Sequence, residues 1–306
     1  MARHAVTGAF GFSGRYIAAR LLEAGHEVLT LTNHQPRSAS PSPGPVAIAP
    51  LVFDAAALAR SLDGVDMLFN TYWVRFSRGG TTHALAVENS LKLIDAARMA
   101  GVRRIVHVSI ANPDATSKLP YYNGKARVEA AVVESGMGYA ILRPTVLFGD
   151  EPILVNNVAW LLRRFPIFGI PGDGSYGIQP IHVADLADLA VGLALLPENV
   201  VVDAAGPETL DFTDFVKMIR GAVGSRSRIV HGSPGLALFA ARLLGRAVGD
   251  VLLTREEMDG LMAGLLVSHS TPLGRTGFAG WLTQASPWLG REYLSEVKRH
   301  FGPVSR

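Results

Sequence analysis

Short apolar runs alternate with amphipathic stretches along the first two thirds of the chain. The apolar runs are rich in Val, Ile and Leu, which is typical of strands covered on both faces. We expect strands at residues 4–6, 26–32, 46–53, 66–70, 104–109, 138–143 and 200–205. The stretches between them repeat apolar residues at helical spacing, as Leu91 and Ile94 do. They predict helices at residues 16–22, 55–62, 83–100, 121–135, 156–165 and 184–196.

This alternation of strand and helix predicts an α/β fold. With right-handed crossovers, such a pattern builds a doubly wound parallel sheet of the Rossmann type. The last third is mostly helical, with Thr213 as the expected cap of a helix, and its elements are expected at residues 214–223, 226–231 (a strand), 234–252, 255–265 and 292–301. We therefore expect a Rossmann domain formed by residues 1–148 and 178–206, and a smaller, mostly helical domain formed by residues 149–177 and 207–306.

A glycine run connects the first expected strand to the first expected helix. Gly8, Gly11 and Gly14 are spaced three residues apart, with Phe10 and Phe12 between them. In this context the first glycine permits a tight turn, the second lets the backbone approach a pyrophosphate, and the third lets the helix pack closely. The helix N-terminus also attracts anions. The run predicts a dinucleotide site in the larger domain, which leaves the smaller domain for a substrate; a glycine-rich turn without a ligand is the alternative.

The end of the second strand bears on which dinucleotide is bound. Folds that prefer NAD place an acidic residue there, about 20 residues after the glycines, for the adenosine ribose. This chain has no acid at that place, and Asn33, His34 and Arg37 follow instead. Because Arg37 can pair with a 2′-phosphate, we expect NADP as the cofactor, with NAD as the second choice and Asn33 as a further contact. A solvated loop arginine is the alternative role of Arg37.

Further cofactor contacts are expected at the carboxyl ends of the strands, where ligands bind in open α/β sheets. Asp54 follows the third strand and either meets the adenine amine or caps the helix at 55–62, which is the commoner role. Asn70 ends the fourth strand and Pro144 follows the sixth, and we assign both to the cofactor.

An aromatic loop follows the fourth strand. Tyr72, Trp73 and Phe76 are expected to line the substrate or nicotinamide pocket, because the loop leaves the carboxyl edge of the sheet. Loop aromatics that only cover a core are the alternative.

Tyr121 and Lys125 open the helix that follows the fifth strand. Because they are four residues apart, they lie on one helical face, a single turn from each other. A phenol has an ordinary pKa of about 10, and a neighbouring ammonium group lowers that pKa toward the range in which proton transfer is effective. Lys125 is also suited to bind the nicotinamide ribose. A surface tyrosine beside a solvated lysine is the alternative.

Together these motifs resemble those of the short-chain dehydrogenase/reductase superfamily. The chain is most similar to its extended and atypical branch, which includes the NAD-dependent epimerase/dehydratase and NmrA-like proteins. The motifs that carry the resemblance lie between residue 1 and about residue 205, and they are Thr7-Gly8-x-x-Gly11-x-x-Gly14, Tyr121-x-x-x-Lys125, Arg143-Pro144-Thr145-Val146-Leu147-Phe148-Gly149 and Ile181-His182-Val183-Ala184-Asp185-Leu186-Ala187.

The resemblance implies roles for individual residues. Tyr121 would be the general acid/base, Lys125 its partner, and Ser109 the hydroxyl that orients a carbonyl. Asn89 would hold a water molecule on its helix. Many sugar epimerases place the working Ser or Thr two positions later, where this chain has Ala111, so two registers stay open for the orienting hydroxyl.

The composition limits the classes of partner. The 306 residues are 48% hydrophobic and 18% charged, which describes a globular protein with an ample core. A net charge of +3 without a Lys/Arg-rich run argues against nucleic acid as a partner. The absence of cysteine excludes disulfides and thiolate catalysis and fits a reducing cytoplasm. No His or carboxylate spacing indicates a metal site.

We also expect no membrane partner. The most apolar late stretch, residues 235–253, is interrupted by Arg242, Arg246 and Asp250, so it suits a buried or interfacial helix better than a span. Because the first strand begins near Met1, we expect no signal peptide and a cytoplasmic location. The family resemblance implies a homodimer formed by the helices that carry Asn89 and Tyr121.

Two classes of function follow from these observations. The first is an NAD(P)-dependent oxidoreductase that acts on a carbonyl or alcohol carbon of a small molecule, with a nucleotide-sugar epimerase or dehydratase as a narrower form. The second, implied by NmrA-like proteins, is a non-catalytic NADP-binding sensor or regulatory protein. The intact Tyr121–Lys125 pair favours an enzyme. Arg163 and Arg164 are candidates for a sugar-nucleotide diphosphate, but basic residues at a helix end also complement its dipole.

Overall fold

The computed structural model describes residues 1–32 and 44–301. The described chain forms two compact units, of which the first contains Met1–Pro144 and Val183–Ala204, and the second contains Thr145–His182 and residues 205–301. The domain limits predicted from the sequence, at residues 148, 178 and 206, lie a few residues from these bounds. That the second unit binds a substrate stays a prediction.

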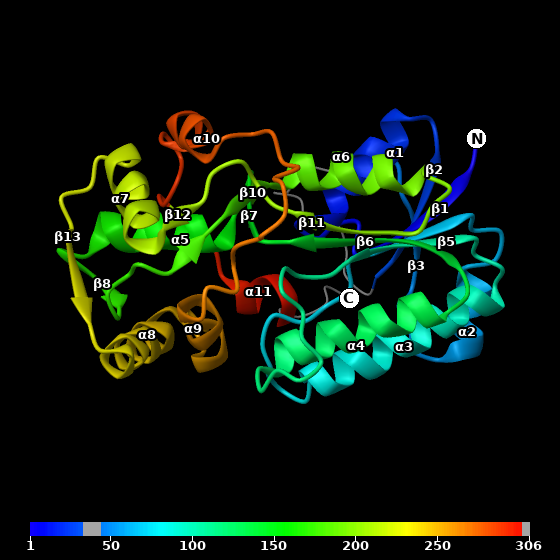
Figure 1. Cartoon of the computed structure of the whole chain (residues 1–306), viewed down its shortest axis with the longest axis horizontal. Coiled ribbons are helices and arrows are strands. Elements are labelled where there is room, and N and C mark those ends of the chain that lie inside the picture. Colours follow the sequence, from blue (N-terminus) through cyan, green and yellow to red (C-terminus); the bar gives the residue numbers. More distant parts are fainter. Residues whose placement is uncertain (33–43, 302–306) are drawn as a thin grey trace. The chain divides into compact units, whose positions relative to one another are not determined.

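The first unit is built on a seven-stranded sheet with the strand order β11-β6-β5-β4-β1-β2-β3 (Figure 1). Every pair of neighbouring strands in this order is parallel. The strands are β1 (Arg3–Thr7), β2 (Glu27–Leu31), β3 (Ala47–Ala49), β4 (Met67–Asn70), β5 (Arg104–Val108), β6 (Gly138–Pro144) and β11 (Val200–Ala204). The parallel Rossmann-type sheet predicted from the sequence is confirmed.

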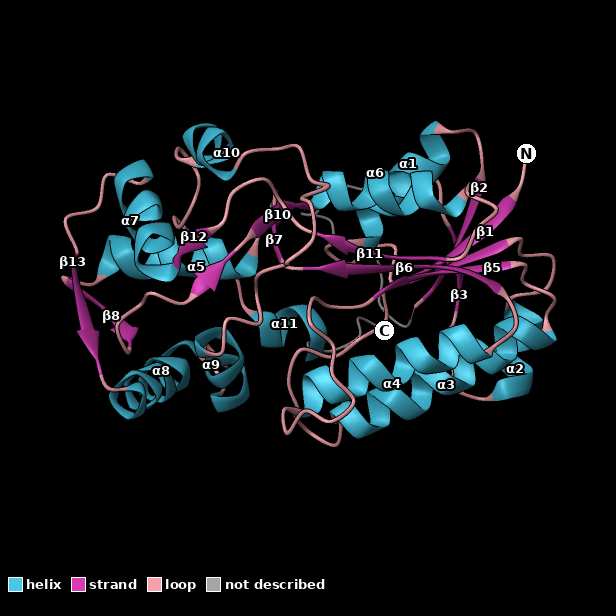
Figure 2. Ribbon diagram, in the orientation of Figure 1, coloured by secondary structure: helices cyan, strands magenta, loops and turns pink. Residues whose placement is uncertain are grey.

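Helices cover both faces of this sheet (Figure 2). On one face α1 and α6 lie side by side, and on the other α3 lies between α2 and α4. These helices are α1 (Gly14–Glu23), α2 (Ala55–Ser61), α3 (His83–Met99), α4 (Pro120–Glu134) and α6 (Val183–Ala194). All residues of β5 are buried, as expected for an apolar strand covered on both faces.

β3 is shorter than the strand predicted at residues 46–53. It pairs only with β2, at the edge of the sheet, and Pro50 follows it at once. Proline has no backbone N–H to donate to a strand ladder, so the pairing ends there. Leu51 and Phe53 pack against the apolar core of the first unit instead of extending the strand.

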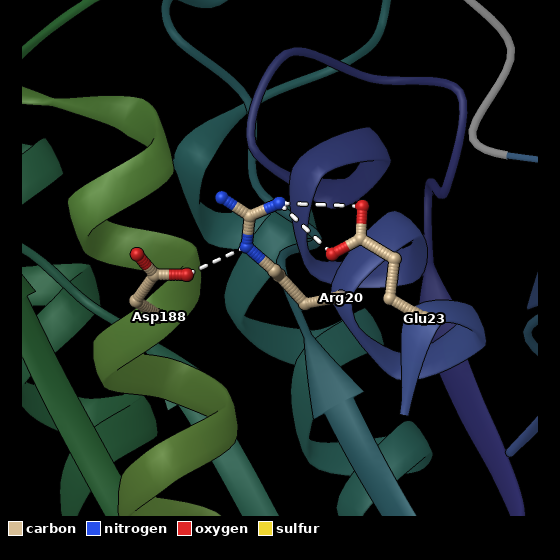
Figure 3. A network of polar contacts seen from close by, with 3 residues as sticks. All are labelled: Arg20, Glu23 and Asp188. Atoms are coloured by element: carbon tan, nitrogen blue, oxygen red, sulfur yellow. Dashed lines mark hydrogen bonds and ion pairs between the residues drawn. The ribbon is translucent and has the colours of Figure 1, made fainter. Parts of the chain in front are cut away.

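A network of three charged side chains joins α1 to α6 (Figure 3). Arg20 donates from Nε to Asp188 Oδ1 at 2.6 Å, and from a terminal nitrogen to Glu23 at 3.1 Å. All three side chains are partly exposed, so solvent screens the attraction and the network contributes less than about 1 kcal/mol. The fully buried Ile17 of α1 and Leu186 of α6 contribute more to holding these helices on the sheet.

A more buried ion pair joins α4 to β6. Arg143 donates from Nε to Oε1 of Glu129 at 3.0 Å and from a terminal nitrogen to Oε2 at 2.6 Å. The Glu129 side chain is only 8% exposed, and that of Arg143 is 32% exposed. This hydrogen bond raises the pKa of Arg143 above its ordinary value. The two-pronged geometry fixes the rotation of both side chains and therefore ties the helix to the strand.

The second unit is mostly helical. Its helices are α5 (Ile153–Arg164), α7 (Phe212–Ala222), α8 (Pro234–Val248), α9 (Arg255–Met262), α10 (Phe278–Ala285) and α11 (Glu296–Phe301). Its short strands pair as β7 (Val146–Phe148) with β10 (Pro180–His182), β8 (Ile167–Pro171) with β13 (Arg228–Gly232), and β9 (Gly177–Ile178) with β12 (Leu210–Asp211). The fully buried rings of Phe148, Phe215 and Phe278 form the centre of its core.

Several predicted helix ends in this unit are wrong, including the start of α7 and the end of α8. Thr213 does not cap α7, because the helix already begins at Phe212, and the Thr213 hydroxyl instead hydrogen-bonds to His231 Nε2 at 3.0 Å. α8 ends at Val248 rather than at residue 252. Gly249 follows with a φ of 68°, a left-handed conformation that glycine adopts without strain and that ends a helix.

The ion pair between α4 and β6 gives a test of the fold. We expect Glu129→Gln to lower the free energy of unfolding by about 1–3 kcal/mol, because it removes the carboxylate that binds a partly buried guanidinium and leaves only the weaker attraction of Asp203. Urea unfolding measures the change. Asp66→Asn, which removes the more exposed Asp66–Arg103 pair, is the matched control and should cost less than about 1 kcal/mol. An equal loss in both variants would contradict the structural importance of the buried pair.

Candidate functional site

The loop between β1 and α1 is shaped by its glycines. Gly8 has a φ of +68°, a conformation that residues with a side chain rarely adopt. Gly11 donates its N–H to the Gly8 carbonyl at 2.7 Å, which closes the turn. A Cβ atom on Gly14 would lie 2.2 Å from the same carbonyl oxygen. Only glycine therefore fits at the point where α1 begins.

This loop fits the pyrophosphate of a dinucleotide. The positive end of the α1 dipole starts at Gly14, directly after the tight turn. Ser13 precedes the helix, but its side chain accepts no hydrogen bond from the helix. The first turn of α1 therefore has no side-chain cap competing with an anion. Phe10 and Phe12 are half-buried in the same loop, and the buried Arg15 guanidinium lies 5.7 Å from the centre of the Phe12 ring.

Two buried threonines hold the loop in place, and neither was predicted from the sequence. The Thr30 hydroxyl on β2 donates to the Val6 carbonyl at 2.9 Å and accepts the Ala9 N–H at 3.0 Å. The Thr7 hydroxyl at the end of β1 accepts the Thr71 N–H at 2.7 Å. The carboxyl ends of β1, β2 and β4 are thereby fixed relative to one another around the glycine turn.

Asn70 extends this network to β5. Its Oδ1 accepts from the Thr7 hydroxyl at 3.2 Å and from the Tyr72 N–H at 3.0 Å, and its amide nitrogen lies 3.2 Å from His107 Nδ1. Burial, and secondarily the charge of Lys125, lowers the pKa of His107 well below its ordinary value, so the ring is neutral. The fully buried Asn70 side chain therefore holds three strand ends together. Its contact with a cofactor stays a prediction.

Asp54 caps α2. Its side chain accepts the Ala57 N–H at 2.9 Å, which is the commoner of the two roles considered for it. Asn33, His34 and Arg37, which were expected to distinguish NADP from NAD, lie outside the described residues.

Lys125 is buried beside the end of β5. Its Nζ donates to the Val108 carbonyl at 2.9 Å and lies 4.5 Å from the centre of the Trp73 ring. The residue is only 2% exposed. Burial lowers the pKa of Lys125 to about 7, and the nearby carboxylate of Glu129 offsets only part of that shift. The amine therefore changes charge near neutral pH.

Ser109 follows the residue whose carbonyl binds this amine, and Tyr121 precedes Lys125 on the same helix. Ser109 directly follows Val108, and its buried hydroxyl has no hydrogen-bond partner among the described residues. Tyr121 lies in the first turn of α4, one turn before Lys125, and its ring meets the Trp73 ring edge-on at 5.7 Å. The structure thus brings Ser109 and Lys125 together at the end of β5, with Tyr121 one helical turn from the lysine.

The aromatic side chains of the loop after β4 lie in different environments. Trp73 stacks on His83 at 6.1 Å and covers the amine of Lys125. The Tyr72 hydroxyl accepts from Asn89 at 3.0 Å, and burial raises the pKa of Tyr72. Phe76 is only 5% exposed. The burial of Phe76 agrees with the alternative of covering a core, and the wall of a substrate pocket stays a prediction for all three aromatics.

The end of β6 fixes the loop that follows β5. The Pro144 carbonyl accepts the Ala111 N–H at 2.9 Å, and the next residue, Asn112, has a φ of 54°, which asparagine tolerates better than most residues. The buried methyl group of Ala111 cannot orient an oxygen. Of the two positions considered for the orienting hydroxyl, Ser109 and Ala111, only Ser109 carries a hydroxyl group.

The sequence contained a signal for some of the unpredicted residues of the site but not for others. Thr30 and His107 are polar residues inside otherwise apolar strands, and buried polar groups need partners, so each marked a place where a network must form. The position of Trp73 over Lys125 depends on the path of the loop after β4. No periodicity or spacing in the sequence specifies that path.

Metal sites and membrane spans were sought in the same residues. In the ranges 1–32 and 44–301, no group of His, Asp and Glu side chains is arranged to hold a metal ion. No helix in these ranges is both long enough and apolar enough to cross a membrane.

The buried lysine predicts how stability depends on pH. The pKa of Lys125 is about 7 in the folded chain and 10.5 as an ordinary value, so between these pH values the unfolded chain holds a proton that the folded chain lacks. The contribution of this lysine to the free energy of unfolding therefore rises by on the order of 4 kcal/mol from pH 7 to pH 10.5, and is constant below pH 7.

Urea unfolding across this range measures the effect. The difference in unfolding free energy between the natural chain and Lys125→Met should grow in favour of the natural chain as the pH rises. Substitution of the exposed Lys118 by Met is the control. The difference in unfolding free energy between the natural chain and this variant should stay constant as the pH rises. If the unfolding free energies of the natural chain and of Lys125→Met changed in parallel with pH, the lysine would not be buried as described.

Comparison with known proteins identifies the family. Residues 8–192, more than half of the chain, match the model of the NAD(P)H-binding family. An uncharacterized protein of Mycobacterium tuberculosis is 30% identical over 237 residues, which cover 76% of this chain and 24% of that protein. The chain thus spans about a quarter of the length of the mycobacterial relatives that it matches.

The names of other relatives refer to larger protein complexes. The mitochondrial NADH dehydrogenase (ubiquinone) 1 alpha subcomplex subunit 9 of Arabidopsis thaliana is 26% identical over 193 residues, which cover 60% of this chain and 47% of the relative. A photosystem II assembly factor of Cyanidium caldarium is 23% identical over 244 residues, which cover 78% of this chain and 77% of the relative.

Solved structures share the fold. The NADPH-dependent quinone oxidoreductase QOR2 of Escherichia coli, complexed with NADPH, has a TM-score of 0.70 at 21% identity and covers 92% of this chain and 98% of its own. MoeE5 in complex with UDP-glucuronic acid and NAD has a TM-score of 0.70 at 19% identity. This match covers 94% of this chain and 98% of the MoeE5 chain. The matched range 8–192 contains the glycine loop, Ser109, Tyr121 and Lys125, and we conclude that this chain belongs to the NAD(P)H-binding family.

Proposed function

We propose that this protein is an NAD(P)H-dependent oxidoreductase of the short-chain dehydrogenase type that acts on a carbonyl or alcohol carbon. The observation that carries the proposal is the buried hydroxyl of Ser109, which has no partner among the described residues and follows the carbonyl that binds Lys125. A buried donor without a protein partner is costly unless a ligand or water pairs with it. A substrate oxygen at this place would satisfy it.

Each of the three catalytic candidates has a distinct role in this proposal. Ser109 donates a hydrogen bond that holds the substrate oxygen. Tyr121 gives a proton to that oxygen during reduction and takes it back during oxidation. When Lys125 is protonated, its charge favours the phenolate of Tyr121, and its pKa of about 7 allows it to change charge in the working pH range.

When bound, the cofactor would supply the hydride for reduction as NAD(P)H and accept it during oxidation as NAD(P)+. We assign its pyrophosphate to residues 8–14, where the glycines form the tight turn at the start of α1. Phe10, Phe12, Asn70, Pro144 and Lys125 complete the proposed set of cofactor contacts among the described residues. Arg37, together with His34, is proposed to favour NADP over NAD through the 2′-phosphate, and Asn33 is proposed as a further cofactor contact.

A small, mostly apolar carbonyl compound is the substrate class we favour. The half-buried Tyr72 and Trp73 follow the carboxyl edge of the sheet and offer aromatic surface rather than charge, whereas Phe76 is buried. The two arginines considered for a diphosphate are already bonded within the second unit, since Arg163 donates to the Leu289 carbonyl and Arg164 to the Arg291 carbonyl. A nucleotide-sugar epimerase or dehydratase is therefore the less supported form of the proposal.

One observation favours a second function, a non-catalytic NADP-binding sensor or regulatory protein. The Trp73 ring covers the amine of Lys125, which is 2% exposed and so is held inside the protein. A sensor needs to bind the dinucleotide but does not need this amine to reach a ligand. Relatives named as an assembly factor and as a subunit of a larger complex are compatible with such a role.

We further propose a cytoplasmic homodimer that pairs through α3 and α4, the helices that carry Asn89 and Tyr121. Exposed apolar side chains on these helices support this choice of surface. Met99 on α3 is 62% exposed, and Val133 on α4 is 46% exposed.

The glycine turn gives the first test of cofactor binding. We expect Gly14→Ala to weaken NADPH binding at least tenfold, because its methyl group would press on the Gly8 carbonyl and open the turn. Isothermal titration calorimetry measures the affinity. Gly192→Ala in α6 is the matched control, since a Cβ there meets no atom within 4 Å, and it should bind NADPH normally. Unchanged affinity in Gly14→Ala would place the cofactor elsewhere.

The catalytic assignment is tested by turnover. With a panel of quinones and of aliphatic and aromatic carbonyl compounds, we expect Tyr121→Phe to lower kcat by about 10²- to 10⁴-fold, because the proton donor is lost. The affinity for NADPH should stay within about twofold of the natural value, because the phenol hydroxyl is assigned to the substrate. The half-buried Tyr139 on β6 provides the control variant Tyr139→Phe, which should turn over normally.

The outcomes separate the two functions. Unchanged turnover in Tyr121→Phe would contradict the role of Tyr121. If the natural chain binds NADPH but reduces no compound in the panel, the sensor is the better description.

A further inference from the structure

α8 exposes an apolar stripe at the surface of the second unit. Leu236 and Phe239 are each 64% exposed, and Leu243 is 58% exposed. Their spacing of three and four residues places them on one face of the helix. Leu238 and Gly245, on the other side, are the residues that the helix buries. The outer face of α8 is therefore as apolar as its inner face, which is unusual for a helix at a protein surface.

The part of the sequence that contains α8 carries mostly positive charge. Residues 215–249 contain six lysines and arginines and no Asp or Glu, although the net charge of the whole chain is only +3, and one of the six, Lys217, pairs with Asp214 just before this range. Arg242 and Arg246 are exposed on α8 itself, next to the apolar stripe, and Arg226 and Arg228 are exposed in and just before β13, which leads into α8. Exposed arginines thus lie on the same helix as the apolar stripe and in the strand that leads into it.

We propose that α8 binds the surface of a membrane that contains anionic lipids. Leu236, Phe239 and Leu243 would enter the boundary between headgroups and acyl chains, while Arg242 and Arg246 pair with lipid phosphates. The helix has 15 residues and, like every other described helix, is too short or too polar to span. It would therefore lie in the plane of the membrane surface.

The composition of the stripe favours a lipid surface over a protein partner. The exposed residues between its large side chains include Ala240 and Ala247, so the stripe offers no side-chain hydrogen bond along its centre. Specific protein interfaces usually carry a polar rim and many hydrogen bonds. A lipid surface requires only apolar area and positive charge.

The structure changes one expectation drawn from the sequence. The expectation of no membrane partner depended on the absence of a spanning segment, and an amphipathic helix at the interface does not need one. The sequence identified residues 235–253 as a buried or interfacial helix. The exposure of Leu236, Phe239 and Leu243 in the structure is what selects the interfacial alternative.

Sedimentation with lipid vesicles tests the proposal on the full chain. We expect the natural protein to bind vesicles of phosphatidylcholine mixed with phosphatidylglycerol, and to bind vesicles of phosphatidylcholine alone at least tenfold more weakly. Phe239→Ser with Leu243→Ser, and separately Arg242→Glu with Arg246→Glu, should each weaken binding to the mixed vesicles at least tenfold. Val52→Ser with Leu195→Ser removes comparably exposed apolar side chains from the first unit and should leave binding unchanged.

Each result decides the question. Unchanged vesicle binding in the Phe239 and Leu243 variant, or equal binding to vesicles with and without phosphatidylglycerol, would overturn the proposal. So would self-association of the natural chain in the absence of lipid that this variant abolishes, since the stripe would then be an interface between copies. NADPH affinity, measured on the same variants, should not change; if the serine variant loses it through misfolding, the arginine variant decides.

Discussion

The approach of the start of α1 to the end of β1 is the constraint on which the first unit depends. A Cβ on Gly14 would lie 2.2 Å from the Gly8 carbonyl oxygen, so helix and strand meet at a distance that only glycine allows. The strand order reverses direction between β1 and β4, and open α/β sheets bind ligands at such a reversal. Thr7 and Asn70 hold the two strand ends on either side of it through hydrogen bonds. The glycine turn, the reversal and the buried polar network therefore occupy one place in the fold.

Most of the first unit could be predicted because its signals are local. The glycine spacing, the apolar strands and the helical periodicity each depend on neighbouring residues, and the parallel sheet follows from their alternation. Asp54 is a cap because a side-chain oxygen before a helix can accept from its first turn, and this requires no distant contact. Where a local rule competed with another, the prediction was less accurate: the apolar residues 46–53 favour a strand, but Pro50 ends the pairing.

The candidate site was harder to predict, because its geometry depends on contacts between distant segments. The spacing of Tyr121 and Lys125 places them on one face of α4, but the sequence does not show that the amine is buried. That burial depends on the Val108 carbonyl from β5 and the Trp73 ring from the loop after β4. The second unit shows the same limit for surfaces. Its local positive charge is hidden in an overall balance of +3, and only the structure shows which face of α8 is exposed.

The environment of Lys125 has a chemical consequence beyond proton transfer. An amine with a pKa of about 7 is uncharged in roughly half of the molecules at neutral pH, and an uncharged amine is a nucleophile. Exposed lysines are almost entirely protonated at that pH and react slowly with aldehydes and acylating agents. The indole of Trp73 lies over this amine, so the loop after β4 helps to keep it away from solvent.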